Sequence, residues 1–293
     1  MSLLLAFIEI IRPYQWIKNI FILAPLMFSG RMLEIELVWL SISAFIMFCL
    51  ASSSVYVFND LQDIESDKKH KKKRNRPLPS GRLKSNSAWV LLIILLGALF
   101  LSIITINPPK EFIVIIISYM IINLGYSLGL KHVAVLEMIM ISVGFILRLL
   151  AGAIIIEESL TDWIVITTGL LALMLTAGKR RGDIVQKNDA QNARRSLEQY
   201  TVPFLDHVIT ALVGAIIVTY LLFCISDYAS MRFGPYILWT TIPVIMGIIR
   251  FQQIIIIESD GGDPTEILYK DRMIQSIVLV WGVLFLGLIY GVN

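Results

Sequence analysis

Long uncharged apolar segments recur along this chain of 293 residues, and they constrain its fold more than any other feature. A helix needs about 20 apolar residues to cross the hydrocarbon core of a bilayer, where its backbone polar groups must be satisfied internally. Hydrophobic residues make up 57% of the chain and the mean hydropathy is +0.76, which excludes an ordinary soluble domain. We therefore expect an all-α polytopic protein in which residues 1–293 form a single integral membrane domain with nine spans. The nine expected spans are Ile17–Gly30, Leu37–Phe58, Ser85–Asn107, Phe112–Leu130, Val133–Ile156, Trp163–Gly178, Val208–Ser226, Phe233–Ile257 and Met273–Asn293.

Charged residues gather in a few loops, and their sign predicts how the chain is oriented in the membrane. The loop Lys68–Lys84 holds nine lysines and arginines and no acid, and the loop Lys179–Pro203 holds six against three acids. Loops rich in Lys and Arg remain in the cytoplasm, so we expect both loops there, on a plasma membrane. The amino terminus is then cytoplasmic and, with nine spans, the carboxyl terminus is outside. Residues 1–11 are expected to form an interfacial helix that leads into the first span.

A cluster of acidic residues ends the second expected span, where residues 59–67 read Asn-Asp-Leu-Gln-Asp-Ile-Glu-Ser-Asp. On a helix, Asp60, Asp63 and Asp67 share one face, and Asn59 lies one turn before Asp63 on the same stripe. Carboxylate oxygens bind Mg²⁺, and Mg²⁺ binds diphosphate, whereas the alternative is a solvated acidic helix end. The spacing, at a membrane boundary and before a basic run, favours a cytoplasmic site for Mg²⁺ and diphosphate. The predicted metal ligands are Asn59, Asp60, Asp63 and Asp67, and the predicted catalytic residues are Asp60 and Asp63.

Basic residues follow the acidic cluster directly and suggest a second set of ligand contacts. Arg74 and Arg76 closely precede the rigid Pro77 and can bind phosphate oxygens that the metal leaves free. The lysines within 68–73 are explained by membrane orientation and by attraction to anionic lipid. We therefore predict substrate contacts for the two arginines rather than for the lysine run.

Arg148 stands well inside an expected span, where a charge is costly unless it faces a polar cavity or a partner. One interpretation is a phosphate ligand in a cavity. The other is a structural pair with a buried acid, either Glu137 or an aspartate of the acidic cluster. The small Ala151 and Gly152 would let a neighbouring helix approach closely.

Three further polar pairs stand at the expected cytoplasmic ends of spans, and each has two interpretations. Their side chains can reach a phosphate at the helix end, or they can serve as interfacial anchors. For Lys18 and Asn19 the ligand role is supported by their depth, because polarity is expensive there. The pairs are Lys18 and Asn19 at the start of the first span, Tyr126 and Lys131 at the end of the fourth, and Lys179 and Arg180 at the end of the sixth.

The Asn-Asp-x-x-Asp-x-x-x-Asp pattern at the end of the second of nine expected helices resembles the UbiA superfamily of membrane prenyltransferases. The resemblance covers nearly the whole chain. It implies a ring of nine helices around a central cavity that opens sideways to lipid. It also implies that the aspartate motif binds Mg²⁺ and diphosphate.

One feature departs from the general pattern of that superfamily, whose members carry a second Asp-x-x-x-Asp motif after the sixth helix. In this chain the corresponding acids are Asp183 and Asp189, six positions apart and surrounded by basic residues. The predicted site therefore has one acidic half and one basic half. Such a site suits a metal-bound diphosphate that meets a second, metal-free phosphate.

Further short motifs, in the same order along the chain, are similar to one branch of the superfamily, the decaprenyl-phosphate phosphoribosyltransferases. This resemblance implies Mg²⁺-dependent transfer of 5-phosphoribose from phosphoribosyl diphosphate to a polyprenyl phosphate such as decaprenyl phosphate, with release of diphosphate. The motifs are Arg12–Asn19, Lys73–Pro77, Tyr126-Ser127 with Lys131-His132, Arg148 with Ala151-Gly152, Gly178–Arg180, Arg195–Thr201, and Asp260–Gly262 with Asp271-Arg272.

The alternative activity is transfer of a prenyl group from prenyl diphosphate to an aromatic or lipid acceptor. That reaction would favour a second acidic pair, which the sequence lacks. The expected partners are phosphoribosyl diphosphate, polyprenyl phosphate and membrane lipids, with no nucleic acid, and the oligomeric state is left open. The expected substrate-binding residues are Lys18, Asn59, Arg74, Arg76, Tyr126, Lys131, Arg148, Lys179 and Arg180.

Overall fold

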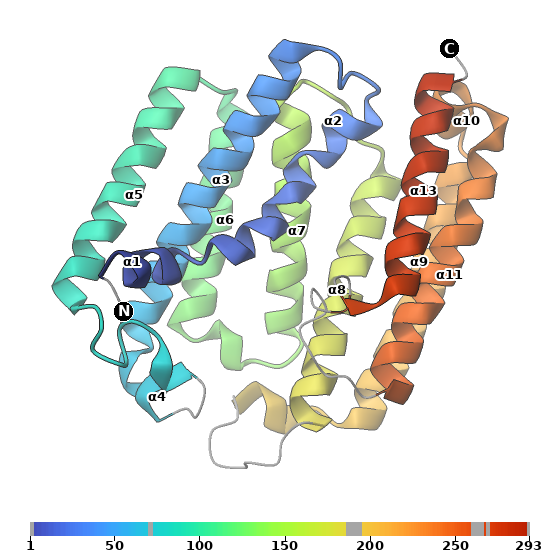
Figure 1. Ribbon diagram of the computed structural model, residues 1–293. Coiled ribbons are helices and arrows are strands. Elements are labelled where there is room, and N and C mark those ends of the chain that lie inside the picture. Colours follow the sequence, from blue (N-terminus) through green and yellow to red (C-terminus); the bar gives the residue numbers. More distant parts are fainter. Residues whose placement is uncertain (1–2, 70–72, 186–194, 259–266, 268–269, 292–293) are drawn as a thin grey trace. The chain divides into compact units, whose positions relative to one another are not determined.

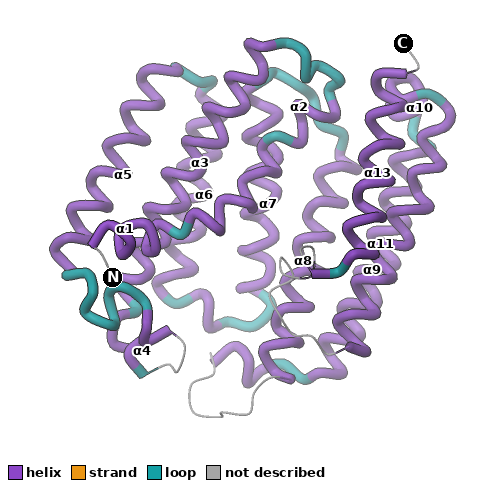
Figure 2. The backbone as a smooth tube through the Cα atoms, in the orientation of Figure 1, coloured by secondary structure: helices purple, strands orange, loops and turns teal. Residues whose placement is uncertain are grey.

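The structure is a computed structural model that describes residues 3–69, 73–185, 195–258, 267 and 270–291. In these residues the regular secondary structure is helical throughout, with no strand, which confirms the all-α class (Figures 1 and 2). The chain divides into two compact units. Unit 1 comprises Met1–Lys131 and Gly144–Ser159, and unit 2 comprises His132–Val143 and Leu160–Asn293.

Eight helices in the described part of the chain are long and apolar enough to cross a membrane, compared with nine expected spans. The difference lies at the first expected span. There the chain forms a 3-10 helix, η1 (Pro13–Ile22), followed by the short α2 (Ala24–Phe28). Proline lacks the amide hydrogen that a helix interior requires, and Pro25 stands in the first turn of a new helix instead of continuing the first. The eight spans are α3 (Ile35–Gln62), α5 (Ser85–Ile106), α6 (Lys110–Leu128), α7 (Leu136–Ile155), α8 (Asp162–Val185), α9 (Val202–Cys224), the segment Pro235–Ile257 and α13 (Arg272–Gly291).

Unit 1 is organised around α3, which packs against α1 (Leu3–Ile11), η1, α5 and α6. The chain runs from α1 through η1 to α2 and then returns along α3 (Figure 1). Two apolar clusters fill this unit, one centred on Phe48 and Phe112 and one that joins α1 to α5. The predicted helix at residues 1–11 is confirmed over the described Leu3–Ile11.

The helix η1 approaches α7 closely at Gly152. This contact confirms the prediction that a small residue there lets a neighbouring helix approach. A Cβ atom added to Gly152 would lie 2.0 Å from the backbone oxygen of Ile22. Only glycine allows the backbone of η1 to come so near. Residue 152 therefore determines where η1 lies in unit 1.

Unit 2 packs α8 against α9, and α11 (Thr241–Gln253) against both α9 and α13. The π-helix η6 (Ile254–Glu258) follows α11. The Arg181 guanidinium donates to the backbone oxygens of Ile255 at 2.8 Å and Ile256 at 3.2 Å, and its Nε bonds Asp206. A π-helix leaves backbone groups in irregular positions, and this buried arginine satisfies two of them. The remaining elements are η4 (Arg195–Gln199), α10 (Asp227–Phe233) and η5 (Pro235–Thr240).

Asp271 lies directly before the first residue of α13, and its carboxylate is held by two hydrogen bonds. One carboxylate oxygen accepts from the Ile274 amide at 2.7 Å, and the other accepts from the Arg250 guanidinium at 2.7 Å. The hydrogen bond from Arg250 is the main cause that lowers the pKa of Asp271 below its ordinary 3.8. Ionised Asp271 therefore stabilises the fold above that ordinary value, and the contribution is lost as the pH falls through the lower, folded-state pKa.

We expect Asp271→Asn to lower the melting temperature at neutral pH, because the charged partner of Arg250 is lost while a side-chain acceptor for the Ile274 amide remains. The difference from wild type should shrink below about pH 4, where unfolded aspartate is protonated. Thermal unfolding of both purified proteins in detergent, from neutral pH to below about pH 4, measures the loss and its decrease at low pH. A difference that stayed constant down to the lowest pH would contradict the ion pair.

Candidate functional site

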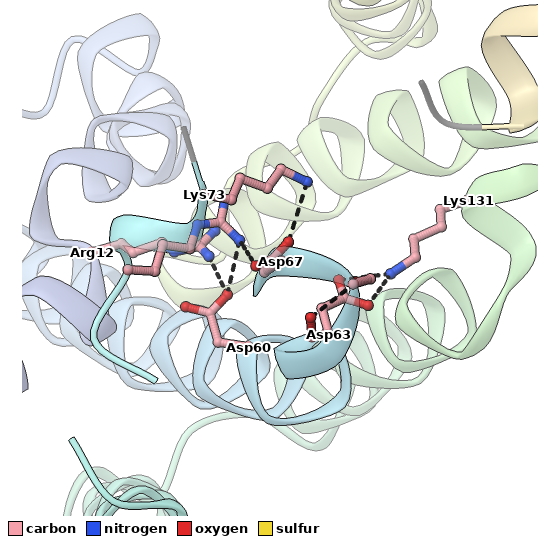
Figure 3. Close-up of polar contacts among 8 residues, drawn as sticks. Arg12, Asp60, Asp63, Asp67, Lys73 and Lys131 are labelled. Carbon is pink, nitrogen blue, oxygen red and sulfur yellow. Dashed lines mark hydrogen bonds and ion pairs between the residues drawn. The ribbon is translucent and has the colours of Figure 1, made fainter. Parts of the chain in front are cut away.

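The acidic motif lies where α3 ends and α4 (Ile64–Lys68) begins. Asp63 follows the last residue of α3 with ψ 6°, and its backbone oxygen still accepts from the Asp67 amide at 2.8 Å. On a regular helix, residues 60, 63 and 67 lie along one stripe about 60° wide. In the structure their side chains pair differently, because Asp60 and Asp67 contact Arg76 whereas Asp63 is directed toward Lys131 (Figure 3).

Asp60 and Asp67 are both 2% exposed and share one arginine. Nη1 of Arg76 lies 3.3 Å from Asp60 Oδ1 and 2.6 Å from Asp67 Oδ2. Arg12, which lies between α1 and η1, donates to the same Oδ1 of Asp60. Lys73 Nζ lies 3.6 Å from Asp67 Oδ1 (Figure 3). Three bases therefore surround two buried carboxylates.

Asp63 pairs with a fourth base. Lys131, in the 3-10 turn η3 (Leu130–His132), donates to both carboxylate oxygens of Asp63 at 2.8 Å (Figure 3). Lys131 is only 9% exposed, so it is not a lysine that extends to the membrane interface. The site as a whole sets four bases, at positions 12, 73, 76 and 131, against three carboxylates. Such a balance suits an anionic ligand.

The arrangement of these carboxylates also tests whether they could hold a divalent ion. Among the described residues, no three His, Cys, Asp or Glu side chains lie close enough together for that purpose. Asp60 and Asp67, however, converge on a single cationic atom, Nη1 of Arg76. Mg²⁺ is usually held by one or two carboxylates together with waters and substrate phosphates. The donor set thus fits a two-carboxylate Mg²⁺ site, whereas the four-residue set expected from the sequence is not gathered at one point.

Arg148 is 5% exposed and lies in a network with neutral partners. Its Nε donates to Asn19 Oδ1 at 2.7 Å, its Nη1 to the Gly144 backbone oxygen at 2.7 Å and its Nη2 to the Tyr119 hydroxyl at 2.9 Å. The Tyr119 ring also lies under the guanidinium, 4.7 Å away. Glu137, one of the acids considered as a partner of Arg148, pairs with Arg180. Arg148 therefore joins α7 to η1 and α6.

Four other predicted residues of unit 1 differ in their surroundings. Arg74 is exposed, in contrast to its neighbour Arg76. Lys18 on η1, Asn59 on α3 and Tyr126 on α6 are half-buried. Their substrate contacts remain predictions. Lys71, Lys72 and Asp189, which the sequence also brought into consideration, lie outside the described residues.

The predicted residues of unit 2 lie on α8. Arg180 is 2% exposed, and its guanidinium pairs with the buried Glu137 at 2.7 Å and with Asp183 at 2.6 Å. Two carboxylates therefore already balance its charge, so a substrate contact by Arg180 would require a rearrangement. Lys179 beside it is half-buried.

The expected site residues did not include Arg12, Lys73 or Tyr119, which take part in these networks. Arg12 has a left-handed backbone (φ 53°) that turns the chain from α1 into η1. An arginine directly before Pro13, at the end of an apolar segment, was a signal that could have indicated it. Lys73 was hidden in a run of lysines, and a single tyrosine inside a span carries no distinguishing signal.

Comparisons with known proteins identify the family of the chain. The model of the UbiA prenyltransferase family matches residues 20–270. A decaprenyl-phosphate phosphoribosyltransferase of Mycolicibacterium smegmatis is 33% identical over 96% of this chain and 91% of its own length. One from Corynebacterium glutamicum is 30% identical over 94% of this chain and 83% of its own length.

A solved structure shares the fold. A UbiA homologue from Archaeoglobus fulgidus, bound to DMAPP and Mg²⁺, superposes with a TM-score of 0.67 at 15% identity, covering 97% of this chain and 98% of its own. Together with the eight apolar helices, this agreement establishes a multi-pass membrane protein. The match of the family model over most of the chain leads to one conclusion: the chain belongs to the UbiA prenyltransferase family.

Proposed function

We propose that this protein transfers the 5-phosphoribosyl group from phosphoribosyl diphosphate to a polyprenyl phosphate and releases diphosphate. The observation that carries the proposal is the excess of bases in the cluster, four against three carboxylates. A purely acidic site holds one metal-bound diphosphate, whereas this mixed site has cations for further phosphate groups. The names of the relatives from Mycolicibacterium smegmatis and Corynebacterium glutamicum support the same reaction.

Mg²⁺ is the proposed cofactor, and Asp60 and Asp67 are the residues that would hold it. They converge on one point at the end of α3, where a guanidinium nitrogen now lies. Bound there, the ion would neutralise charge that develops on the leaving diphosphate. The solved UbiA homologue from Archaeoglobus fulgidus, which has bound Mg²⁺, supports the choice of Mg²⁺ as the cofactor.

The residues of the chain would act by position and charge. In the reaction the bond from C1 of the ribose to the diphosphate oxygen breaks, and a bond from C1 to a phosphate oxygen of the lipid forms. The lipid phosphate is already an anion at neutral pH, so no general base is needed. Arg12, Lys73 and Arg76 offer cations to the departing diphosphate on one side, and Lys131 offers one on the other. Fixed charges of this kind stabilise a transition state without reorganisation.

In this proposal the whole chain is one domain of the plasma membrane. The acidic cluster and the amino terminus would lie on the cytoplasmic side. The basic loop Lys68–Lys84 supports this orientation, because such loops remain in the cytoplasm. Phosphoribosyl diphosphate is a soluble, highly charged donor, so its site should face the aqueous cytoplasm.

The direct test incubates membranes that contain the protein with phosphoribosyl diphosphate labelled in the ribose, Mg²⁺ and polyprenyl phosphate. We expect label in the lipid phase, and we expect its loss when EDTA removes Mg²⁺. Membranes without the protein are the control. If product formed only from prenyl diphosphate with an aromatic or lipid acceptor, the chain would be a prenyltransferase instead.

A further inference from the structure

The amino-terminal helix α1 is joined by an ion pair to the loop that carries Arg76. Arg82 Nη1 lies 2.7 Å from Glu9 Oε2, and Arg82 Nη2 lies 2.9 Å from Glu9 Oε1. The two residues are 73 positions apart, so the pair connects two distant parts of the unit 1 sequence. Two parallel bonds between a guanidinium and a carboxylate define direction as well as distance.

Arg82 also organises the loop from within. Its Nη2 donates to the backbone oxygen of Asn75, and its Nε donates to Ser80 Oγ at 3.1 Å. Ser80 Oγ in turn donates to the backbone oxygen of Arg76 at 2.6 Å. A continuous series of hydrogen bonds thus leads from Glu9 on α1 to the residue that bridges Asp60 and Asp67.

Apolar packing supports the same connection. Leu78 and Leu83 of the loop are 5% and 2% exposed, and they belong to one buried cluster with Ala6 and Ile10 of α1. Burying such side chains fixes the loop against the helix. The loop therefore cannot move without α1.

The rest of α1 is suited to the membrane. Leu3, Leu4 and Ile8 are 60%, 67% and 45% exposed, which gives the helix an outward apolar face that lipid would cover. Past its last residue the chain turns at Arg12, whose guanidinium bonds Asp60. Both arginines that contact Asp60 thus depend on where α1 lies.

We propose that α1 is a membrane-seated support for the diphosphate site, and that Glu9 and Arg82 are positioning residues that hold Arg12 and Arg76 beside Asp60. The proposal rests on the proposed function, since it concerns the diphosphate end of the donor. Neither Glu9 nor Arg82 touches the acidic cluster in the contacts described above. Their effect on the reaction is therefore indirect.

A double-mutant cycle with Glu9→Gln, Arg82→Gln and the double variant tests this role. We expect each single change to raise the KM for phosphoribosyl diphosphate by about 5- to 10-fold with a smaller change in kcat, because a donor-binding contact is displaced. The double variant should be no worse than Arg82→Gln alone, because both changes break the same connection. A half-exposed ion pair contributes little to global stability, so the melting temperature should stay close to wild type.

Unit 1 offers a matched control in the pair Arg31 and Glu34. This exposed pair has the same two-bond geometry, at 2.7 Å and 2.8 Å, but no connection to the Arg76 loop. Arg31→Gln and Glu34→Gln should leave the KM within about twofold of wild type. An unchanged KM in Glu9→Gln and Arg82→Gln, or a loss of activity that merely follows a loss of thermal stability, would overturn the positioning role.

A binding measurement separates this inference from the proposed reaction. Titration of the purified variants with inorganic diphosphate in the presence of Mg²⁺ reports the same site without any transfer. Suppose that wild type does not transfer phosphoribose but that the substitutions still weaken diphosphate binding non-additively. The support role would then be retained, and the proposed donor would be wrong. If the four proteins bound diphosphate equally, the support role would fall.

Discussion

Replacing Asp60 with asparagine is expected to lower phosphoribosyl transfer by about 100-fold or more, while the protein still reaches the membrane. Asn keeps the shape of the side chain but removes its charge. That change removes a proposed Mg²⁺ ligand and leaves Arg12 and Arg76 facing a neutral amide. Initial rates, normalised to the amount of protein in the membrane, measure the effect.

Two companion variants make this prediction specific. Asp63→Asn should also lower transfer strongly, because it leaves Lys131 without its carboxylate. Glu65→Gln is the control, since Glu65 lies in the same short segment but is exposed and pairs with Lys68 at 2.6 Å. Its rate should stay within about twofold of wild type. Full activity in both aspartate variants would refute the assignment of the motif.

The second large effect is expected at a glycine remote from the carboxylates. Gly152→Ala would place a Cβ atom 2.0 Å from the backbone oxygen of Ile22, so η1 must move. We expect a loss of about 3 kcal/mol or more in the free energy of unfolding, as for severe overpacking. The melting temperature should fall by about 10 °C. Activity should fall as well, because η1 carries Asn19, the partner of Arg148.

Gly97 in α5 is the matched control for that substitution. A Cβ atom there would meet nothing within 4 Å, and alanine is the better helix former. Gly97→Ala should therefore leave the melting temperature unchanged or slightly higher. If Gly152→Ala melted within about 2 °C of wild type, the close contact between η1 and α7 would be wrong.

The main elements of the candidate site were predictable because their signals are local. Clustered carboxylates at the end of an apolar span have a chemical use whatever the surrounding fold is. The sequence also singled out Arg76 beside Pro77, and in the structure Arg76 pairs with Asp60 and Asp67. The same pattern singled out Arg74, which the structure leaves exposed. Which of the two arginines faces the carboxylates depends on the fold of the loop, where Ser80 and Arg82 make hydrogen bonds.

Partner choices were less predictable, because they depend on contacts between segments far apart in the sequence. Arg148 was expected to bind a phosphate or a buried acid, and in the structure it binds Asn19, 129 positions away. Glu137 was one of the acids considered for it, but Arg180 holds that carboxylate. The cost of a buried charge indicates that a partner is required, but it does not indicate which one.

Hydrophobic length and residue type act locally, so they were enough to predict the helical membrane class and eight of the spans and to single out the acidic motif. Three features emerged only from the folded chain: Arg12 and Arg76 meet at Asp60, Asp63 turns to Lys131, and the first expected span breaks into η1 and α2. An ion pair or a close backbone contact depends on the distance between folded segments. That distance is set by packing, as at Gly152, and not by the residues of any one segment.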